Sequence, residues 1–469
     1  MDKNKIFLIN RGDLKDRIDP LYNKYILQFN LNEIETIKLN DVLFDNPMYG
    51  ANESSIEFNK VCRYIRITDI DEFGLLKKDG IRSAEKEEAK YKVHLNDILF
   101  ARSGATVGKA YIHLDSSLNA IFAGYLIRFR INESLLLSKF LFYFTQTTIY
   151  KEWVNAIQRT AGQPNINAEE YKSLLIPNLK LDIQQNIIDM MDKAYESKKQ
   201  KEKEAQDLLD SIDDYLFDKL GIKLPNEPEN NIENRTFKVG FDDVFGSRFD
   251  GYYNKPYYLQ VEEELHKTNY DLYSLIELCN GIRGVTYSSD DEDNNGIIGI
   301  LRGNNIDLKT NELYLTDIRY LKNSFIFNEN QKLQKNDILM SAASGSKEHV
   351  GKVAFIENDL DYYFGAFMMV LRVYNQKVNP FYLFGYLQSK LFRQLLMRIL
   401  GGTNINNLNF NMIKNYKIPL PNITIQNEIA DEINERRQKA KQLQNEAKLE
   451  LENAKKEVEK IILGDSYEC

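Results

Sequence analysis

The chain has 469 residues, of which 43% are hydrophobic and 28% are charged, as in ordinary folded proteins. Three widely separated cysteines and four dispersed histidines argue against a disulfide framework and against a zinc site. No apolar run approaches the ~18 residues that span a bilayer, and the first ten residues are too polar for a secretory signal. We therefore expect a cytoplasmic protein.

Charge is distributed unevenly along the chain. The formal net charge of −8 argues on its own against a nucleic-acid partner. However, residues 381–420 contain five lysines and arginines and no acidic residue, and residues 91–130 contain five against two aspartates. Because a phosphate-facing surface needs local rather than overall positive charge, DNA binding remains compatible with this composition.

Short strands followed by helices are predicted twice in chain order. Strand-like segments separated by Gly, Asn, Asp and Ser lie at 61–70, 95–101, 107–114 and 121–131. A broad apolar face then predicts a helix over 135–160. The second set has strands near 297–301, 336–342, 350–356 and 364–374 and a helix near 379–400. Both modules are therefore predicted to be α+β.

The two halves of the chain repeat one ordered set of motifs about 240 residues apart. The repeated pairs are RIDPLYNK at 17–24 and RFDGYYNK at 248–255, NDIL at 96–99 and 336–339, Gly108-Lys109 and Gly351-Lys352, Asn165-Ile166-Asn167 and Asn404-Ile405-Asn406, and Gln184 and Gln426. A period this long indicates that each copy is a whole domain with an appended element.

Each module is followed by a long predicted helix with an apolar stripe. Apolar residues recur at steps of three and four from 187 and from 429, with an interruption at Lys198 and Lys201. Neither helix can bury this stripe alone, so we expect the two to pair as an antiparallel coiled coil. The alternative is that each helix packs only on its own module. The predicted packing residues are Ile187, Met191, Leu208, Ile212, Ile433, Ala447, Leu451 and Val458.

The predicted fold class is α+β, with two β-rich domains joined by two long helices that form an antiparallel coiled coil, in a pseudo-twofold duplication. The expected boundaries are 1–180 for the first domain, 181–221 for the central long helix, 222–240 for a linker, 241–421 for the second domain and 422–469 for the C-terminal long helix.

Catalytic motifs are not found in the sequence. It contains no GxxxxGK[ST] phosphate loop, no HExxH zinc motif and no GxSxG nucleophile motif. The segment DNPMY at 45–49 is only superficially close to the motif of methyl-donor-dependent enzymes, because it has one proline and no glycine-rich donor loop nearby. We expect no catalytic residue and no metal site in this chain.

Polar and basic residues gather at the ends of the duplicated NDIL strands and in the loops after the helices. Arginine and lysine can bond to phosphate or guanine, and asparagine and glutamine can bond to adenine. The same residues could equally form β-turns or helix caps. The candidate DNA-binding residues are Arg66, Arg102, Ser103, Lys109, Gln163, Asn165, Arg302, Asn304, Ser344, Lys347, Lys352, Thr403 and Asn404.

This ordered set of motifs, present twice, resembles the specificity (S) subunit of type I restriction–modification systems over essentially the whole chain. The resemblance implies that each module is a target-recognition domain for one half of a bipartite sequence in double-stranded DNA, and that the coiled coil sets the spacer. It implies two methyltransferase (M) subunits as partners, which bind S-adenosylmethionine, and motor-nuclease (R) subunits as further partners. It implies no cofactor in this chain.

Two other functions remain open. A self-contained restriction or modification enzyme would bind S-adenosylmethionine or cut DNA with magnesium without partners. A coiled-coil scaffold or inhibitor of the modification machinery would give no sequence-selective footprint on DNA in the presence of M subunits.

Overall fold

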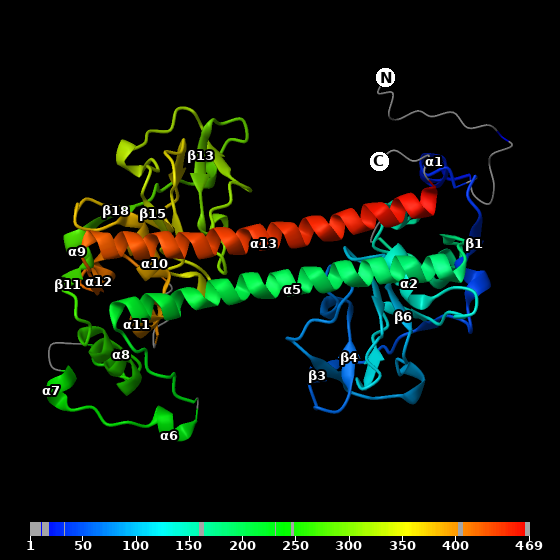
Figure 1. Ribbon diagram of the computed structural model, residues 1–469, viewed down its shortest axis with the longest axis horizontal. Coiled ribbons are helices and arrows are strands. Elements are labelled where there is room, and N and C mark those ends of the chain that lie inside the picture. The colour runs from blue at the N-terminus through cyan, green and yellow to red at the C-terminus, as the bar shows by residue number, and fades with distance from the viewer. Residues whose placement is uncertain are drawn as a thin grey trace. The chain divides into compact units, whose positions relative to one another are not determined.

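The computed structural model describes residue 11 and residues 18–31, 33–158, 164–229, 231–244, 248–401 and 407–464 (Figure 1). The chain divides into two compact units, which we call unit 1 (Met1–Glu202 with Gln444–Cys469) and unit 2 (Lys203–Leu443). Each unit combines one β-rich module with parts of the two long helices α5 (Leu181–Leu220) and α13 (Ile423–Leu463). The domain boundaries expected from the sequence stay predictions.

Unit 1 is built on a four-stranded antiparallel sheet in the order β2-β9-β6-β7. A parallel pair β4-β8 and antiparallel pairs β3-β5 and β1-β10 complete its strands. The strands are β1 (Thr36–Lys38), β2 (Met48–Tyr49), β3 (Ser55–Glu57), β4 (Arg63–Ile65), β5 (Arg82–Ala84), β6 (Ile98–Ala101), β7 (Ala110–Ile112), β8 (Ala120–Phe122), β9 (Leu126–Phe129) and β10 (Leu175–Pro177). The helices are α1 (Pro20–Gln28), α2 (Ser138–Phe144), α3 (Thr148–Ile157) and α4 (Ala168–Lys172), with 3-10 helices η3 (Leu39–Val42), η4 (Ile67–Asp69) and η5 (Ala89–Tyr91).

Unit 2 repeats this plan with the sheet β12-β18-β15-β16, a three-stranded sheet β14-β13-β17 and the pair β11-β19. The strands are β11 (Leu272–Ser274), β12 (Cys279–Arg283), β13 (Ile298–Leu301), β14 (Arg319–Leu321), β15 (Ile338–Ser341), β16 (Val353–Phe355), β17 (Tyr362–Phe364), β18 (Met368–Val373) and β19 (Lys417–Pro419). The helices are α6 (Ile232–Arg235), α7 (Phe241–Val244), α8 (Pro256–His266), α9 (Leu275–Leu278), α10 (Pro380–Gln388), α11 (Lys390–Leu400) and α12 (Phe410–Ile413), with 3-10 helices η6 (Ser289–Asp291), η7 (Gly303–Asn305), η8 (Glu329–Gln331) and η9 (Lys347–His349).

The predicted fold class, two α+β modules with a pair of long helices, is confirmed. The sequence predicted one helix over 135–160 and one over 379–400. This prediction is wrong in one respect, because each segment forms two helices. Thr147 and Ser389 are the N-cap residues of α3 and α11, and each hydroxyl accepts a backbone N–H of the helix that follows it. A hydroxyl that caps a new helix ends the preceding one, although the apolar pattern continues across the break.

The repeated Asn-Asp-Ile-Leu motif holds the central strand of each sheet in place. Asn96 adopts the left-handed backbone conformation, with a φ of 67°, in the turn before β6. The buried Asp97 that follows accepts a hydrogen bond from Arg130 Nε at 2.9 Å. In unit 2 Asp337 and Arg372 repeat this ion pair at 2.7 Å. The motif is therefore explained by an ion pair with a buried carboxylate, and removal of the arginine is costly because it takes this charged partner away from the carboxylate.

The repeated glutamine fastens each long helix to its module. Gln184 is buried in the first turn of α5, where its Oε1 accepts the backbone N–H of Leu137 at 2.8 Å and its Nε2 donates to the carbonyl of Leu179 at 2.8 Å. Gln426 on α13 accepts the backbone N–H of Asn379 at 2.8 Å in the same way. Both glutamines thus join the start of a long helix to the start of a module helix.

Within unit 1, α5 and α13 pack against each other and run antiparallel. Lys201 Nζ bonds to Glu446 at 2.9 Å and to Glu450 at 2.5 Å, and Ser197, one turn earlier on α5, also bonds to Glu450, at 2.6 Å. The lysines that interrupt the apolar stripe are therefore accommodated, because Lys201 faces acidic residues of α13. Lys198 instead bonds to Glu202 and lies over the ring of Phe73.

Within unit 2 the remaining parts of the two helices also pack together. Ala205 of α5 lies against Ala440 and Leu443 of α13, and Arg436 donates to the carbonyl of Ser211 at 2.9 Å. Figure 1 shows the two helices side by side. Of the predicted packing residues, Leu208 is half-buried and the others are buried: Ile187, Met191, Ile212, Ile433, Ala447, Leu451 and Val458. The helices pack on each other and also on the modules, because both core clusters contain residues of α5 and α13.

Each unit also uses an acidic residue of a long helix to cap a module helix. In unit 1 Glu459 of α13 accepts the backbone N–H of Thr148 at the start of α3. In unit 2 Asp213 of α5 accepts the backbone N–H of Lys390 at the start of α11, at 3.2 Å. Carboxylates at these positions satisfy backbone donors that have no partner within the helix.

Replacing Ile433 with Asp tests the packing of α13. Ile433 is buried in the core of unit 2 and lies against Gly385 of α10. We expect the free energy of unfolding to fall by roughly 3–5 kcal/mol, because the change removes apolar contacts and buries an unpaired carboxylate. Leu449→Asp on the same helix is the control, since this leucine is 61% exposed. Equal thermal stability of the two variants would contradict the burial of this stripe.

Asp213 gives a pH-dependent test of the capping contact. Burial raises its pKa from 3.8 to about 6, partly offset by the Lys390 N–H. The native state binds this proton more tightly than the unfolded state does, so protonation of Asp213 stabilises the fold. This contribution to the free energy of unfolding is fully present below pH 3.8 and is lost as the pH rises through 6. Asp213→Asn should therefore be as stable as wild type near pH 4 and more stable by up to about 3 kcal/mol at pH 8.

Denaturant unfolding at pH 4 to 8 measures this difference. The control is Asp214→Asn, because Asp214 is exposed on the same helix. A stability difference for Asp213→Asn that does not change with pH would contradict the raised pKa.

Candidate nucleic-acid interface

Two predicted arginines are held within their modules by aspartates. Arg66 Nη2 bonds to Asp69 at 2.5 Å, beside η4. Arg302, which precedes η7, bonds to Asp317 at 2.9 Å, and Asn304 donates to the same carboxylate at 2.7 Å. These contacts order equivalent loops and partly neutralise the arginines. A DNA contact from them stays a prediction.

The duplicated lysines occupy equivalent positions inside the modules. Lys109 Nζ donates to the carbonyl of Ile70 at 3.1 Å, and Lys352 Nζ donates to the carbonyl of Ile306 at 2.6 Å. Burial lowers the pKa of both amines. In each module the lysine thus connects the main sheet to the end of a 3-10 helix. This internal contact is enough to explain why the lysine occurs in both copies.

The other predicted loop residues of unit 2 lie at the end of β15. Ser344 accepts the backbone N–H of Ser346 at 3.3 Å, and the carbonyl of Lys347 accepts from Arg393 at 2.9 Å. Three further predicted residues lie outside the described residues: Gln163, Thr403 and Asn404.

The structure brings Arg102, Ser103 and Asn165 together at the end of β6. Ser103 and Asn165 form a β-bridge, and the Arg102 guanidinium lies 5.1 Å from the ring centroid of Tyr49 on β2. The buried Nε of Arg102 has no hydrogen-bond partner within the described chain. In contrast to Arg66 and Arg302, Arg102 has no acidic partner among the described residues, so its charge can act on a ligand.

Two aromatic residues beside these strand ends were missed by sequence reasoning. Tyr125, in the β8–β9 turn, is 61% exposed, and Phe367, in the β17–β18 turn, is 70% exposed. The carbonyl of Tyr125 accepts the Arg102 backbone N–H at 3.0 Å, and the carbonyl of Phe367 accepts that of Ala342 at 2.8 Å. We call the end of the sheet around Tyr125 the unit 1 tip and the end around Phe367 the unit 2 tip. The sequence contained one signal for these two residues, because an aromatic residue occurs at the same place in both copies.

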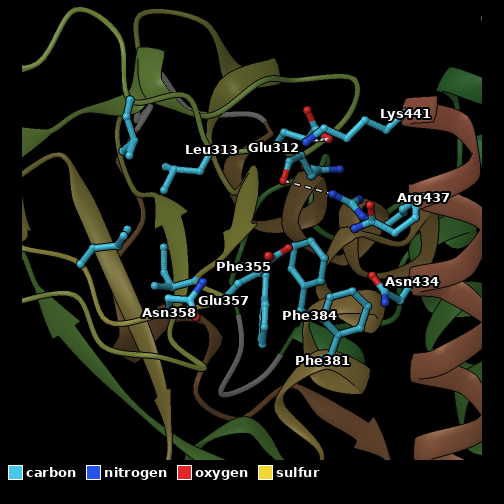
Figure 2. Close-up of a pocket in the computed structure, with 15 residues that line it drawn as sticks. Glu312, Leu313, Phe355, Glu357, Asn358, Phe381, Phe384, Asn434, Arg437 and Lys441 are labelled. Atoms are coloured by element: carbon cyan, nitrogen blue, oxygen red, sulfur yellow. Dashed lines mark hydrogen bonds and ion pairs between the residues drawn. The ribbon is translucent and has the colours of Figure 1, made fainter. Parts of the chain in front are cut away.

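A pocket of about 250 Å³ in unit 2 is lined by aromatic, acidic, basic and amide side chains (Figure 2). Its floor is aromatic, and Arg437 of α13 lies 5.1 Å from the ring centroid of Phe384 and donates to Gln388 at 3.0 Å. Lys441 forms an ion pair with Glu312 at 3.0 Å across the pocket. The two cations are thus used within the module.

The described residues contain neither a candidate metal cluster nor a membrane-spanning helix. No cluster of three or more His, Cys, Asp or Glu side chains there is arranged to hold a metal ion. None of the helices in that part of the chain has the length and apolar character needed to cross a membrane.

Comparison with known proteins identifies one family in both halves of the chain. Residues 32–207 and 267–453 match the family described as the Type I restriction modification DNA specificity domain. Both the unit 1 tip and the unit 2 tip lie within the matched residues.

Two curated relatives match a shorter segment. The chain is 31% identical over 155 residues to the type I restriction enzyme StySPI specificity subunit of Salmonella potsdam, which is 32% of this chain and 33% of the relative. It is 30% identical over 155 residues to the EcoKI specificity subunit of Escherichia coli (strain K12), which is 32% of each chain. The similarity therefore spans about a third of each relative.

One solved structure has a similar fold over most of the chain. It comes from a study of complex assembly and conformational transition of the type I R-M system. It covers 92% of this chain and 96% of that chain, with a TM-score of 0.51 and 15% sequence identity. With the family match in both halves, the chain belongs to the type I restriction modification DNA specificity family and carries its domain twice.

Proposed function

We propose that the chain is the DNA sequence-recognition subunit of a type I restriction–modification complex, in which each unit recognises one half of a bipartite target in double-stranded DNA. The duplication carries this proposal. Both units repeat the same sheet, the same ion pair with a buried aspartate and an aromatic residue at the tip, whereas the polar residues around the two tips differ. Two similar but unequal modules suit a target with two similar but unequal halves.

The long helices would set the number of base pairs between the half-sites. A helix of 40 residues such as α5 extends about 60 Å at a rise of about 1.5 Å per residue. The packing of α5 with α13 in each unit supports this role, because a helix pair resists bending better than a single helix.

The proposed partners are two M subunits, one on each unit, with R subunits joining for cleavage in the cytoplasm. S-adenosylmethionine would be bound by the M subunits, which would transfer its methyl group to adenine. The net charge of −8 supports a share of the phosphate contacts being made by these partners.

Mapping of methylated adenines tests the proposal. Cells that express this chain with the M subunits of its own system should acquire adenine methylation in a split motif, and cells with the M subunits alone should not. A reconstituted complex should protect the same motif from nuclease digestion. Methylation that is identical with and without the chain would contradict the proposal and would favour a scaffold or inhibitor.

Arg102→Ala should weaken binding of the reconstituted complex to its target by roughly 10- to 100-fold, because a guanidinium contact to a base contributes about 1–3 kcal/mol. Titration of labelled DNA measures the affinity, and gel filtration checks that the subunits still assemble. Lys86→Ala is the control, since Lys86 is exposed in the same unit. Unchanged affinity for Arg102→Ala would mean that this loop is only a structural turn.

Lys109→Met should act differently, through stability. Removing the ammonium leaves the buried carbonyl of Ile70 without this donor, which should lower the free energy of unfolding by about 1–2 kcal/mol. The affinity of the folded complex for DNA should stay within about twofold of wild type. Loss of DNA affinity with unchanged thermal stability would instead place Lys109 in the DNA interface.

A further inference from the structure

We propose that Tyr125 and Phe367 are the equivalent DNA-contacting aromatic residues of the two units, each acting with one arginine that lies on a different strand in the two copies. This inference rests on the proposed function and deepens it by naming the chemistry of recognition at each half-site.

The two rings occupy the same structural position. In unit 1 the residue after Tyr125 begins β9, and Leu126 pairs with Ala101 of β6. In unit 2 the residue after Phe367 begins β18, and Met368 pairs with Ser341 of β15. In both units the carbonyl of the aromatic residue accepts a backbone N–H from the end of the central strand. The equivalence therefore follows from strand pairing.

Both rings are presented to solvent by a fixed backbone. The residues that follow them, Leu126 and Met368, are fully buried, whereas Tyr125 is 61% and Phe367 is 70% exposed. One exposed aromatic residue needs no explanation, but two at the same turn of diverged modules indicate a shared ligand. Because the turn is held by the sheet, a ring placed there loses little conformational freedom on binding.

The arginine of each tip lies on a different strand in the two units. In unit 1 it is Arg102, at the end of β6, packed against Tyr49. In unit 2 the Arg102 position is Ala342, and the Tyr49 position is taken by Arg283 of β12. Tyr49 pairs with Ile127, and Arg283 pairs with Met369 at the equivalent place in β18.

Each tip therefore keeps one arginine and one exposed ring in a different arrangement. Arg283 is exposed, and its side chain has no hydrogen-bond or ion-pair partner in the described part of the chain. Arg102 and Arg283 are thus available to a ligand. In contrast, Arg66 and Arg302 are paired with aspartates.

This combination suits the edges of base pairs in double-stranded DNA. A guanidinium donates two hydrogen bonds to guanine or binds a phosphate, and an apolar ring contacts the thymine methyl group or wedges against a base step. The two arginines lie on opposite sides of the strand that follows the ring, β9 in unit 1 and β18 in unit 2, so each would reach a different base pair. The two units would then recognise different half-sites by one mode of contact.

The test uses the complex of the full chain with its M subunits and DNA that carries both half-sites. Tyr125→Ala and Phe367→Ala should each lower target affinity by roughly 5- to 100-fold, because an aromatic contact to a base contributes about 1–3 kcal/mol. Phe44→Ala in unit 1 and Ile326→Ala in unit 2 are controls, since these side chains are 76% and 92% exposed. Thermal unfolding of the four variants should match wild type, because all four side chains are exposed.

Half-site variants of the DNA make the assignment specific. Scrambling the half-site of unit 1 should abolish the effect of Tyr125→Ala and leave that of Phe367→Ala intact, and scrambling the other half-site should do the reverse. Arg283→Ala should lose affinity for the same half-site as Phe367→Ala, and Tyr125→Phe should retain affinity.

The inference and the proposed function fail in different ways. A wild-type complex that does not distinguish target from scrambled DNA overturns the proposed function. A selective wild-type complex whose Tyr125→Ala and Phe367→Ala variants bind like the two controls overturns this inference alone.

Discussion

Neither long helix can cover its own apolar stripe in water, and this constraint organises the rest of the molecule. Ile187 and Met191 of α5 share the core of unit 1 with Leu451 and Val458 of α13. The core of unit 2 likewise contains residues of both helices. Each core is therefore completed by a segment that lies far away in the sequence. The capping carboxylates Glu459 and Asp213 make the same long-range connections with hydrogen bonds, and the buried glutamines join each long helix to the module that precedes it.

Residues that the fold requires are the same in the two units, whereas residues at the tips differ. The ion pairs recur with the same geometry, and so do the lysine contacts to carbonyls. The aspartates of these pairs and the residues whose carbonyls accept from the lysines are buried, so removing the basic partner would leave a buried acceptor without this contact. The tips have no such constraint. Arg102 in one unit is matched by Ala342 in the other without a change in strand pairing, so the scaffold allows specificity to vary at this end of the sheet.

Much of the architecture could be predicted from the sequence. Each duplicated motif is a short run of residues that can be recognised in both copies, and the apolar period can be read along each long helix. The breaks before α3 and α11 could not be predicted, since Thr147 and Ser389 lie within a continuous apolar pattern and act through a hydroxyl cap. The contacts of Lys109 and Lys352 with the carbonyls of Ile70 and Ile306 could not be predicted either, because a lysine in a sequence does not reveal which carbonyl it meets, and their contact with DNA stays a prediction. The exposure of Tyr125 and Phe367 depends on neighbours distant in sequence, so single-residue propensity gives no warning of it.

The division of the core of unit 1 between the two ends of the chain has a consequence for biosynthesis. Leu451, Val458 and Ile462 follow the whole of unit 2 in the sequence, and they pack in the same cluster as Tyr25 and Phe29. Unit 2 ends at Leu443, so all of its residues are synthesised before these three. A nascent chain must therefore keep its first module unfinished until Leu451 to Ile462 have left the ribosome, and a product truncated before Leu451 would expose apolar surface to chaperones and proteases.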